Sequence, residues 1–230
     1  MTDFATKNKV FIVLTVGTII LLLGGVFLFS GKSATNNSTN KIAASLLIPQ
    51  SATKTSGFAN GNYLPVSPSA TTTLVEFGDY ECPACATYDP MVKQLLTEYS
   101  GKLTFVFRNY PLPQHTNAPI SSYAVEAAGL QGKYWQMHDK IYETQNDWAN
   151  LSDAKSVFVG FAQGFNLNVD QFTKDLASLI IKNIVQNDLN DGNTIGITET
   201  PTFYLNGQKI TLTGSYEQLK SLVAAAVANQ

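Results

Sequence analysis

Two cysteines separated by two residues, Cys82 and Cys85, constrain the fold of this 230-residue chain more than any other feature, because they are its only cysteines. They stand between residues 73–80, which are rich in β-branched and aromatic side chains, and a helical pattern at 83–99. Proline suits the first turn of a helix, so Pro83 makes Cys82 the residue at the start of that helix. The sequence therefore predicts a strand, a turn and a helix, with both thiols at the turn.

This position favours redox chemistry at the cysteines. The start of a helix carries unpaired N–H groups and the positive end of the helix dipole, and both stabilise a thiolate, the reactive form of Cys82. Cys85 lies one turn further in, where we expect it to be buried and to act as the resolving thiol. The two residues are close enough in sequence to form a small disulfide ring.

Three other interpretations of the pair remain open. A structural zinc site needs four ligands, and the chain adds only His115 and His138, whose spacing is far from that of a zinc finger. A purely structural disulfide would close too small a loop to add much stability, and the cysteines could simply be packed in a core. We expect structural roles for both histidines, and neither a metal nor another cofactor.

The rest of the pattern gives one α/β domain over residues 60–230. Strands are predicted at 73–80, 103–110, 202–205 and 208–212, and helices at 83–99, 119–130, 134–145, 152–165, 169–190 and 215–228. Asn206-Gly207 between the last two strands is typical of a hairpin, and Ser215 is the expected N-cap of the last helix. The order is β-α-β, a helical insert at about 115–191, then β-β-α, which is a thioredoxin-like fold.

Four separated motifs carry a family resemblance. The chain resembles the DsbA-like thiol–disulfide oxidoreductases, and most of all their membrane-tethered extracytoplasmic branch in bacteria. The resemblance covers about residues 60–230 in consistent order. Its motifs are VEFGDYECPAC at 75–85, RNYPL at 108–112, GKYWQMHD at 132–139 and TPTFYLNG at 200–207.

The resemblance implies roles for particular residues. Cys82 becomes the nucleophile and Cys85 its partner. Pro201 becomes a cis-proline that faces the cysteine pair, and the backbone of Thr200 pairs with substrate. One departure matters: the two residues between the cysteines are Pro and Ala, without the histidine that helps to stabilise the thiolate in the best-known oxidases.

Glu76 is the fifth candidate site residue. The resemblance places a buried acid here that shuttles the proton of the second cysteine. The residues support this independently, because a carboxylate within an apolar strand should be partly buried, which raises its pKa toward the range useful for proton transfer. The alternative is a glutamate on an edge strand that faces water.

The expected activity is donation of a disulfide to reduced secreted proteins. The resemblance implies re-oxidation by a quinone-linked membrane partner of the DsbB or vitamin K epoxide reductase-like kind. Two other functions stay open. The chain could be a reductase or isomerase fed by a membrane electron donor, or a non-catalytic tethered chaperone or metal-binding module.

The N-terminal segment predicts a membrane anchor. Residues 10–29 are apolar and carry no charge, and a helix of that length spans about 30 Å, the thickness of the bilayer hydrocarbon. Lys7 and Lys9 precede it, so residues 1–9 are expected in the cytoplasm and everything after the span outside the cell membrane. Polar residues 30–59 are expected to form a flexible linker. A cleaved signal peptide and a buried soluble helix are the alternatives.

The charge distribution argues against nucleic-acid binding. Residues 71–230 carry sixteen acids and ten bases, and Arg108 is the chain's single arginine. Affinity for a phosphate backbone needs clustered Lys and Arg side chains. We therefore expect partners to be proteins and the membrane.

Overall fold

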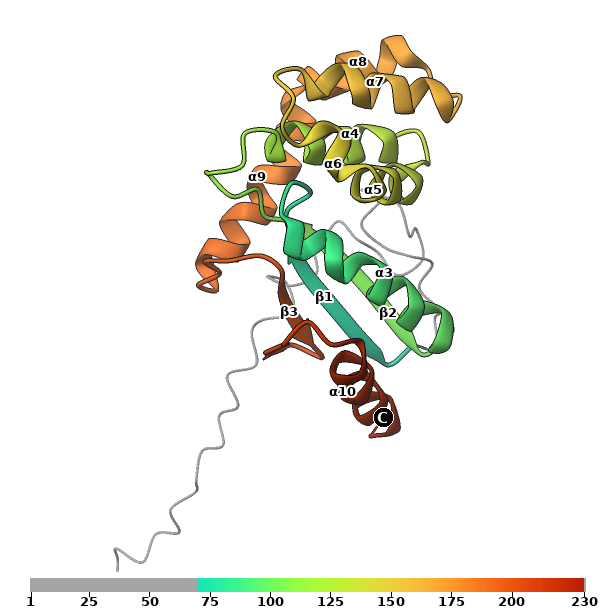
Figure 1. Ribbon diagram of the computed structural model, residues 1–230, viewed down its shortest axis with the longest axis vertical. Helices are drawn as coiled ribbons and strands as arrows, with labels where there is room; N and C mark the ends of the chain where they lie inside the picture. Colours follow the sequence, from blue (N-terminus) through green and yellow to red (C-terminus); the bar gives the residue numbers. More distant parts are fainter. Residues whose placement is uncertain (1–69, 230) are drawn as a thin grey trace, which may run out of the picture. The chain divides into compact units, whose positions relative to one another are not determined.

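The computed structural model describes residues 70–229, which form an α/β domain around a four-stranded mixed sheet (Figure 1). The strand order is β2-β1-β3-β4. β1 pairs in parallel with β2 and antiparallel with β3, which forms an antiparallel hairpin with β4. Their bounds are Thr72–Gly78 for β1, Leu103–Asn109 for β2, Thr202–Leu205 for β3 and Gln208–Ile210 for β4. β1 is therefore an inner strand of the sheet.

Alternate residues of β1 belong to two different apolar cores, as the two-residue period of a strand requires. Leu74 packs in a core that includes the cysteines and the inner sides of α3 (Pro83–Glu98) and α10 (Tyr216–Ala228). Val75 and Phe77 pack in the second core, on the opposite face of the sheet. By the same alternation, Glu76 faces the side of Leu74 and the cysteines.

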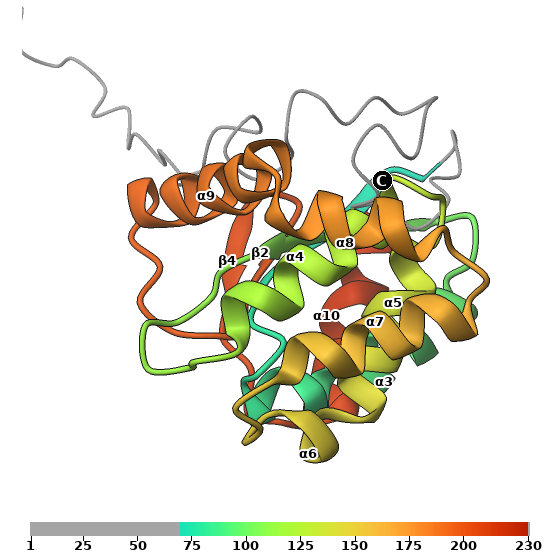
Figure 2. The same ribbon diagram turned by 90° about the horizontal axis from the view of Figure 1, so that it is seen from above.

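A helical insert separates β2 from β3, and Figure 2 shows its helices stacked beside one another. α4 contacts four of the other insert helices and so forms the centre of the layer. The bounds of the insert helices are Ala118–Gly129 for α4, Tyr134–Glu143 for α5, Gln145–Trp148 for α6, Ala154–Gly164 for α7, Val169–Ala177 for α8 and Leu179–Thr194 for α9.

Local capping explains where several helices begin. The side chains of Asp153, Asn168, Ser178 and Ser215 each accept a hydrogen bond from the N–H group three residues further on. Such caps satisfy N–H groups that the first turn leaves unpaired. The predicted cap at Ser215 is thus confirmed.

The structure corrects the predicted helix at 169–190. Ser178 has an extended backbone, with φ −71° and ψ 148°, and it ends α8 and caps α9. The predicted helix at 134–145 also ends early, at Glu143, so that Gln145 starts the separate helix α6. The last strand stops at Ile210 instead of residue 212. The order of elements is otherwise as predicted.

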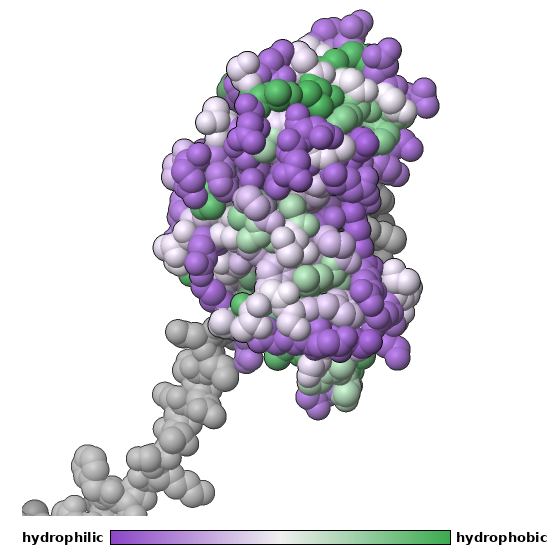
Figure 3. All heavy atoms as spheres, viewed as in Figure 1, coloured by the Kyte–Doolittle hydropathy of each residue, from purple (hydrophilic) through white to green (hydrophobic). Residues whose placement is uncertain are grey.

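Large apolar side chains reach the surface mainly in the insert. Within residues 70–229, the exposed ones are Leu130, Leu151, Leu179 and Ile180. Figure 3 shows a hydrophobic patch on the part of this face that Figure 1 labels α7 and α8, while hydrophilic side chains cover much of the remainder. The exposed large apolar side chains of the described residues thus all belong to the insert.

The predicted anchor at 10–29, the linker at 30–59 and the cytoplasmic residues 1–9 lie outside the described residues. Within residues 70–229, no helix combines the length and the apolar character needed to span a membrane.

Candidate active site

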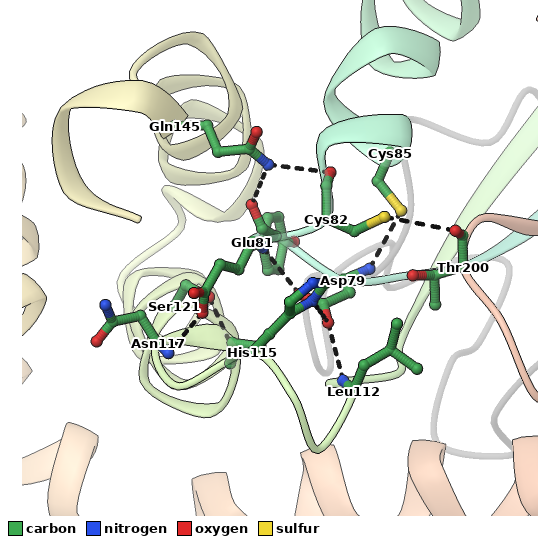
Figure 4. Close-up of polar contacts among 12 residues, drawn as sticks. Asp79, Glu81, Cys82, Cys85, Leu112, His115, Asn117, Ser121, Gln145 and Thr200 are labelled. Carbon is green, nitrogen blue, oxygen red and sulfur yellow. Dashed lines mark hydrogen bonds and ion pairs between the residues drawn. The ribbon is translucent and has the colours of Figure 1, made fainter. Parts of the chain in front are cut away.

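Both cysteines lie where β1 turns into α3. Cys82 is the N-cap residue of α3, with Pro83 in the first turn as predicted, and its backbone N–H donates to the carbonyl of Asp79 at 3.1 Å. Figure 4 shows the sulfur atoms of Cys82 and Cys85 pointing toward each other. Both are free thiols; Cys82 is 7% exposed and Cys85 is fully buried. The pair is reached from the side of Cys82.

The surroundings of Cys82 stabilise its thiolate. A hydrogen bond from the Cys85 thiol is the largest influence, and together with the Thr200 side chain and the backbone N–H groups of Cys85 and Ala84 it outweighs burial and lowers the pKa of Cys82 to about 5. The expected stabilisation by the start of the helix is confirmed, although the largest influence is the neighbouring thiol. A thiolate therefore predominates at neutral pH.

Cys85 has the opposite character. Burial is the main cause that raises its pKa well above the ordinary value, and the hydrogen bond to Cys82 and the charge of Glu76 add to it. The backbone N–H of Asp79 donates to Cys85 Sγ at 3.5 Å. The two thiols thus differ in both access and acidity, which is the asymmetry predicted from the sequence.

Thr200 and Pro201 lie beside Cys82. The Thr200–Pro201 peptide bond is cis, as predicted. Cys82 Sγ donates to the carbonyl oxygen of Thr200 at 3.4 Å (Figure 4). Next to them is a hollow of about 240 Å³, lined by Tyr88, residues 199–203 and residues 209–212. The hollow thus adjoins Thr200, the residue whose carbonyl contacts Cys82 Sγ.

Glu76 lies on the inner strand β1 and is 3% exposed, so the alternative of a water-facing edge glutamate is wrong. Burial raises the pKa of Glu76 well above its ordinary value, with contributions from the charges of Asp89 and Cys82, while a hydrogen bond with Cys85 acts in the opposite direction. Within residues 70–229, Oε1 of Glu76 has no hydrogen-bond partner. The carboxyl group of Glu76 thus lies close to the buried thiol of Cys85, with its pKa shifted toward the neutral form.

The two histidines have structural partners. His115 Nδ1 lies 2.7 Å from Asp79 Oδ2. His138 is buried among aromatic rings, with Nδ1 2.8 Å from the Tyr80 hydroxyl. His138 thus packs in the core as expected, and His115, expected to be structural, pairs with the buried Asp79.

Among residues 70–229, one cluster brings ligand-type atoms close enough together to hold a metal ion. Atoms of Asp89, His138 and Asp139 lie within 4.8 Å of one another. The ammonium group of Lys93 lies 2.8 Å from Asp89 and 2.9 Å from Asp139, so a cation of the chain itself already pairs with both carboxylates. This arrangement is an ion-pair network.

Sequence reasoning missed two residues that shape the turn. Asp79 is fully buried and accepts hydrogen bonds from the backbone N–H groups of Glu81 and Leu112, both at 2.8 Å. Gln145 donates from the insert to the carbonyls of Tyr80 and Cys82. Aspartate beside glycine is a turn signal that could have indicated Asp79, but no local signal marks Gln145.

Comparison with solved structures places the fold among thiol–disulfide oxidoreductases. BdbD from Bacillus subtilis in its oxidised form is 22% identical, covers 73% of this chain and 92% of its own, and has a TM-score of 0.64. The α-DsbA1 structure from Wolbachia pipientis is 20% identical, with coverage of 73% and 91% and a TM-score of 0.63. A thioredoxin-like oxidoreductase from Silicibacter pomeroyi is 22% identical, covers 71% of this chain and 90% of its own, and has a TM-score of 0.59.

Curated relatives with higher identity have a different name. A Na(+)/H(+) antiporter NhaA 1 from Salinispora arenicola is 34% identical over 160 residues, which are 69% of this chain and 24% of the antiporter. A Na(+)/H(+) antiporter NhaA 3 from Salinispora tropica is 32% identical over 161 residues, which are 70% of this chain and 24% of the antiporter. The chain thus spans about a quarter of the length of these relatives.

A family model that matches most of the domain identifies the family of this chain. The sequence model described as thioredoxin matches residues 67–225, which include both cysteines, Glu76 and the Thr200–Pro201 bond. With this match, the chain belongs to the thioredoxin family, and its fold is that of the solved DsbA-type structures.

Proposed function

We propose that the protein is a membrane-anchored oxidase that donates the disulfide of Cys82 and Cys85 to reduced secreted proteins. The observation that carries the proposal is the contrast between the two thiols, with the pKa of Cys82 lowered to about 5 and that of Cys85 raised. A stabilised thiolate at Cys82 favours the reduced form of the enzyme over its disulfide, and such a couple oxidises its partners.

The exchange takes place in two steps. A substrate thiolate attacks Cys82 Sγ of the oxidised pair, forms a mixed disulfide and breaks the bond to Cys85, whose sulfur takes the electron pair. A second substrate thiolate then attacks the substrate sulfur of the mixed disulfide and releases Cys82 as a thiolate. The substrate loses two electrons and gains a disulfide, and the enzyme becomes the dithiol.

Glu76 supplies the proton in the first step. The departing Cys85 sulfur is buried and becomes a thiol, so it needs a proton from a group inside the protein. The Glu76 carboxyl has a raised pKa and lies against Cys85. When the enzyme is re-oxidised, Cys85 returns the proton to Glu76, which is the shuttle expected of a base of matched pKa.

The substrate lies in the hollow beside Thr200 and Pro201. Its position next to Thr200, whose carbonyl contacts Cys82 Sγ, supports binding of an extended segment whose backbone pairs with Thr200. Tyr88 and Lys209 also line this hollow.

The setting of the reaction is the outer side of the cell membrane. The uncharged sequence 10–29 behind Lys7 and Lys9 supports a single span with the catalytic domain outside. Turnover then needs an electron acceptor, which we assign to a quinone-linked membrane protein of the DsbB-like or vitamin K epoxide reductase-like kind.

Redox equilibration of the full chain with glutathione, in detergent, tests the function. We expect half-reduction at a potential near the oxidising end of the range, above that of thioredoxin, which lies at about −270 mV. A value near that of thioredoxin would support a reductase instead. Absence of any reversible couple would leave the chaperone or metal-binding alternative.

A further inference from the structure

The helical insert reaches the active-site turn through the side chain of Gln145. This residue begins α6 and is buried. Its Nε2 donates to the carbonyl oxygen of Tyr80 at 2.8 Å and to that of Cys82 at 3.0 Å (Figure 4). One amide group thus holds two carbonyls of the turn that carries the nucleophile.

The bond to the Cys82 carbonyl has a geometric consequence. The direction of this carbonyl is set by the ψ angle of Cys82, which is 120°. The same angle sets how the sulfur, attached through Cβ to the same Cα, lies relative to the first N–H groups of α3. The backbone N–H groups of Ala84 and Cys85 are among the groups that lower the pKa of Cys82. Holding the carbonyl therefore also holds the alignment of sulfur and N–H groups.

The bond to the Tyr80 carbonyl holds the peptide unit that joins Tyr80 to Glu81. The opposite end of that unit is the N–H of Glu81, which donates to Asp79 Oδ1 at 2.8 Å. The unit is thereby fixed at both ends, by Gln145 from the insert and by Asp79 at the start of the turn. Rotation of the turn toward or away from the sulfur requires one of these bonds to break.

We propose that Gln145 is a positioning residue for Cys82: its amide fixes the carbonyls of Tyr80 and Cys82 and so keeps the sulfur aligned with the first N–H groups of α3. This inference rests on the proposed function of Cys82 as nucleophile. It makes the insert a contributor to the reactivity of the cysteine pair, through a residue that touches neither sulfur nor substrate.

The chain offers a matched control in Asn117. Its side chain is buried to the same extent as that of Gln145, and its Nδ2 donates to the carbonyls of Ala149 and Leu151, both at 2.9 Å. Gln145→Met and Asn117→Leu thus each remove two amide-to-carbonyl hydrogen bonds and preserve approximate shape. Only the first removes side-chain bonds to the turn, because Asn117 contacts Glu81 of the turn through its backbone N–H, which Asn117→Leu keeps.

The test is the rate of Cys82 alkylation by iodoacetamide in the reduced full chain, followed by peptide mapping from pH 4 to pH 9, with thermal unfolding in parallel. We expect Gln145→Met to move the half-maximal rate about one pH unit higher, which would slow alkylation at pH 5 about fivefold. Asn117→Leu should lose similar stability and keep the wild-type profile. Equal profiles in the two variants, shifted or not, would overturn the proposal.

A second variant covers failure of the first to fold. Gln145→Asn keeps the amide but is one methylene shorter and cannot hold both carbonyls, so we expect a shift in the same direction and of smaller size. An unchanged profile would again count against positioning. The outcome is independent of the glutathione equilibrium of the wild-type protein, which tests the proposed function, since alkylation reports Cys82 whichever way electrons flow.

Discussion

Glu76 and Asp188 are two buried carboxylates, each 3% exposed, in regions of the molecule with different polar surroundings. Asp188 lies where α9 meets β2, and both of its oxygens are paired. Oδ1 accepts from Arg108 Nε at 2.6 Å, and Oδ2 accepts from the backbone and side-chain nitrogens of Asn109 at 2.9 and 3.0 Å. Glu76 lies beneath Cys85 and has one oxygen without a partner.

This difference separates a structural use of a buried acid from a chemical one. A paired buried charge resists removal, because loss of either partner leaves the other uncompensated. An incompletely paired acid instead exists as the neutral form and can exchange a proton. We infer that the Arg108–Asp188 pair holds the insert to the sheet. The incompletely paired Glu76 lowers the stability of the fold but can exchange a proton.

The largest effect is expected at the cysteines themselves, in the reactive region. Cys82→Ser should abolish exchange with a reduced peptide, because no other thiol is accessible. Cys85→Ser should accumulate mixed disulfides, since the resolving thiol is gone. Non-reducing electrophoresis of both variants with a cysteine-containing peptide checks this. Mixed disulfides in Cys82→Ser would reverse the assigned order of the thiols.

The next largest effect should come from breaking the paired region. Arg108→Met leaves Asp188 buried without its cation, and we expect the free energy of unfolding to fall by about 3–5 kcal/mol. Urea unfolding measures it. In the folded fraction, the pH profile of Cys82 alkylation should match the wild type. A loss below about 1 kcal/mol would remove the distinction between the two regions.

Glu76→Gln should have an intermediate effect, and mainly on rate. The amide cannot donate and regain a proton in the same way, so release of Cys85 should slow by roughly 10²-fold. Single-turnover reaction of the oxidised enzyme with a thiol peptide measures this step.

The same variant also carries a pH signature. Because the pKa of Glu76 is raised on folding, its favourable contribution is present below the ordinary pKa of a carboxyl group and is lost as the pH rises through the raised value. Wild-type stability should therefore decline more steeply over that interval than the stability of Glu76→Gln. Parallel curves for the two proteins would show that folding does not raise the pKa of Glu76.

The smallest effect is expected at the outer partner of Arg108. Asp191 Oδ2 accepts from Arg108 Nη2 at 2.6 Å, but its side chain is 32% exposed. Water screens such a pair, so Asp191→Asn should cost about 1 kcal/mol or less in urea unfolding. If Asp191→Asn lowered the free energy of unfolding as much as Arg108→Met, burial would not determine how much each ion pair at this junction contributes.

Much of the fold and part of the site follow from local sequence. The order of elements, the cysteines at a helix start and the buried acid on β1 were all predictable, because each depends on neighbouring residues. The cis bond before Pro201 also followed from a short motif. These features involve periodicity, capping and proline geometry, which act over a few residues.

The contacts that complete the site join distant parts of the chain. Gln145 bonds to a turn more than sixty residues earlier in the sequence, and Asp188 bonds to Asn109 across most of the insert. No local pattern distinguishes these side chains from others of their kind. The break at Ser178 was missed for a related reason, since serine within an apolar period can cap a helix or continue it.

The place of the insert between β2 and β3 also affects the order in which the domain can form. β1 meets β2 early in the chain, but β3, which also pairs with β1, follows the entire insert. Pairing across so long a segment is slow compared with local folding. While a new chain is being made from its N-terminus, both cysteines exist before Thr200 does. For that interval they are ordinary exposed thiols, open to any oxidant that the chain meets.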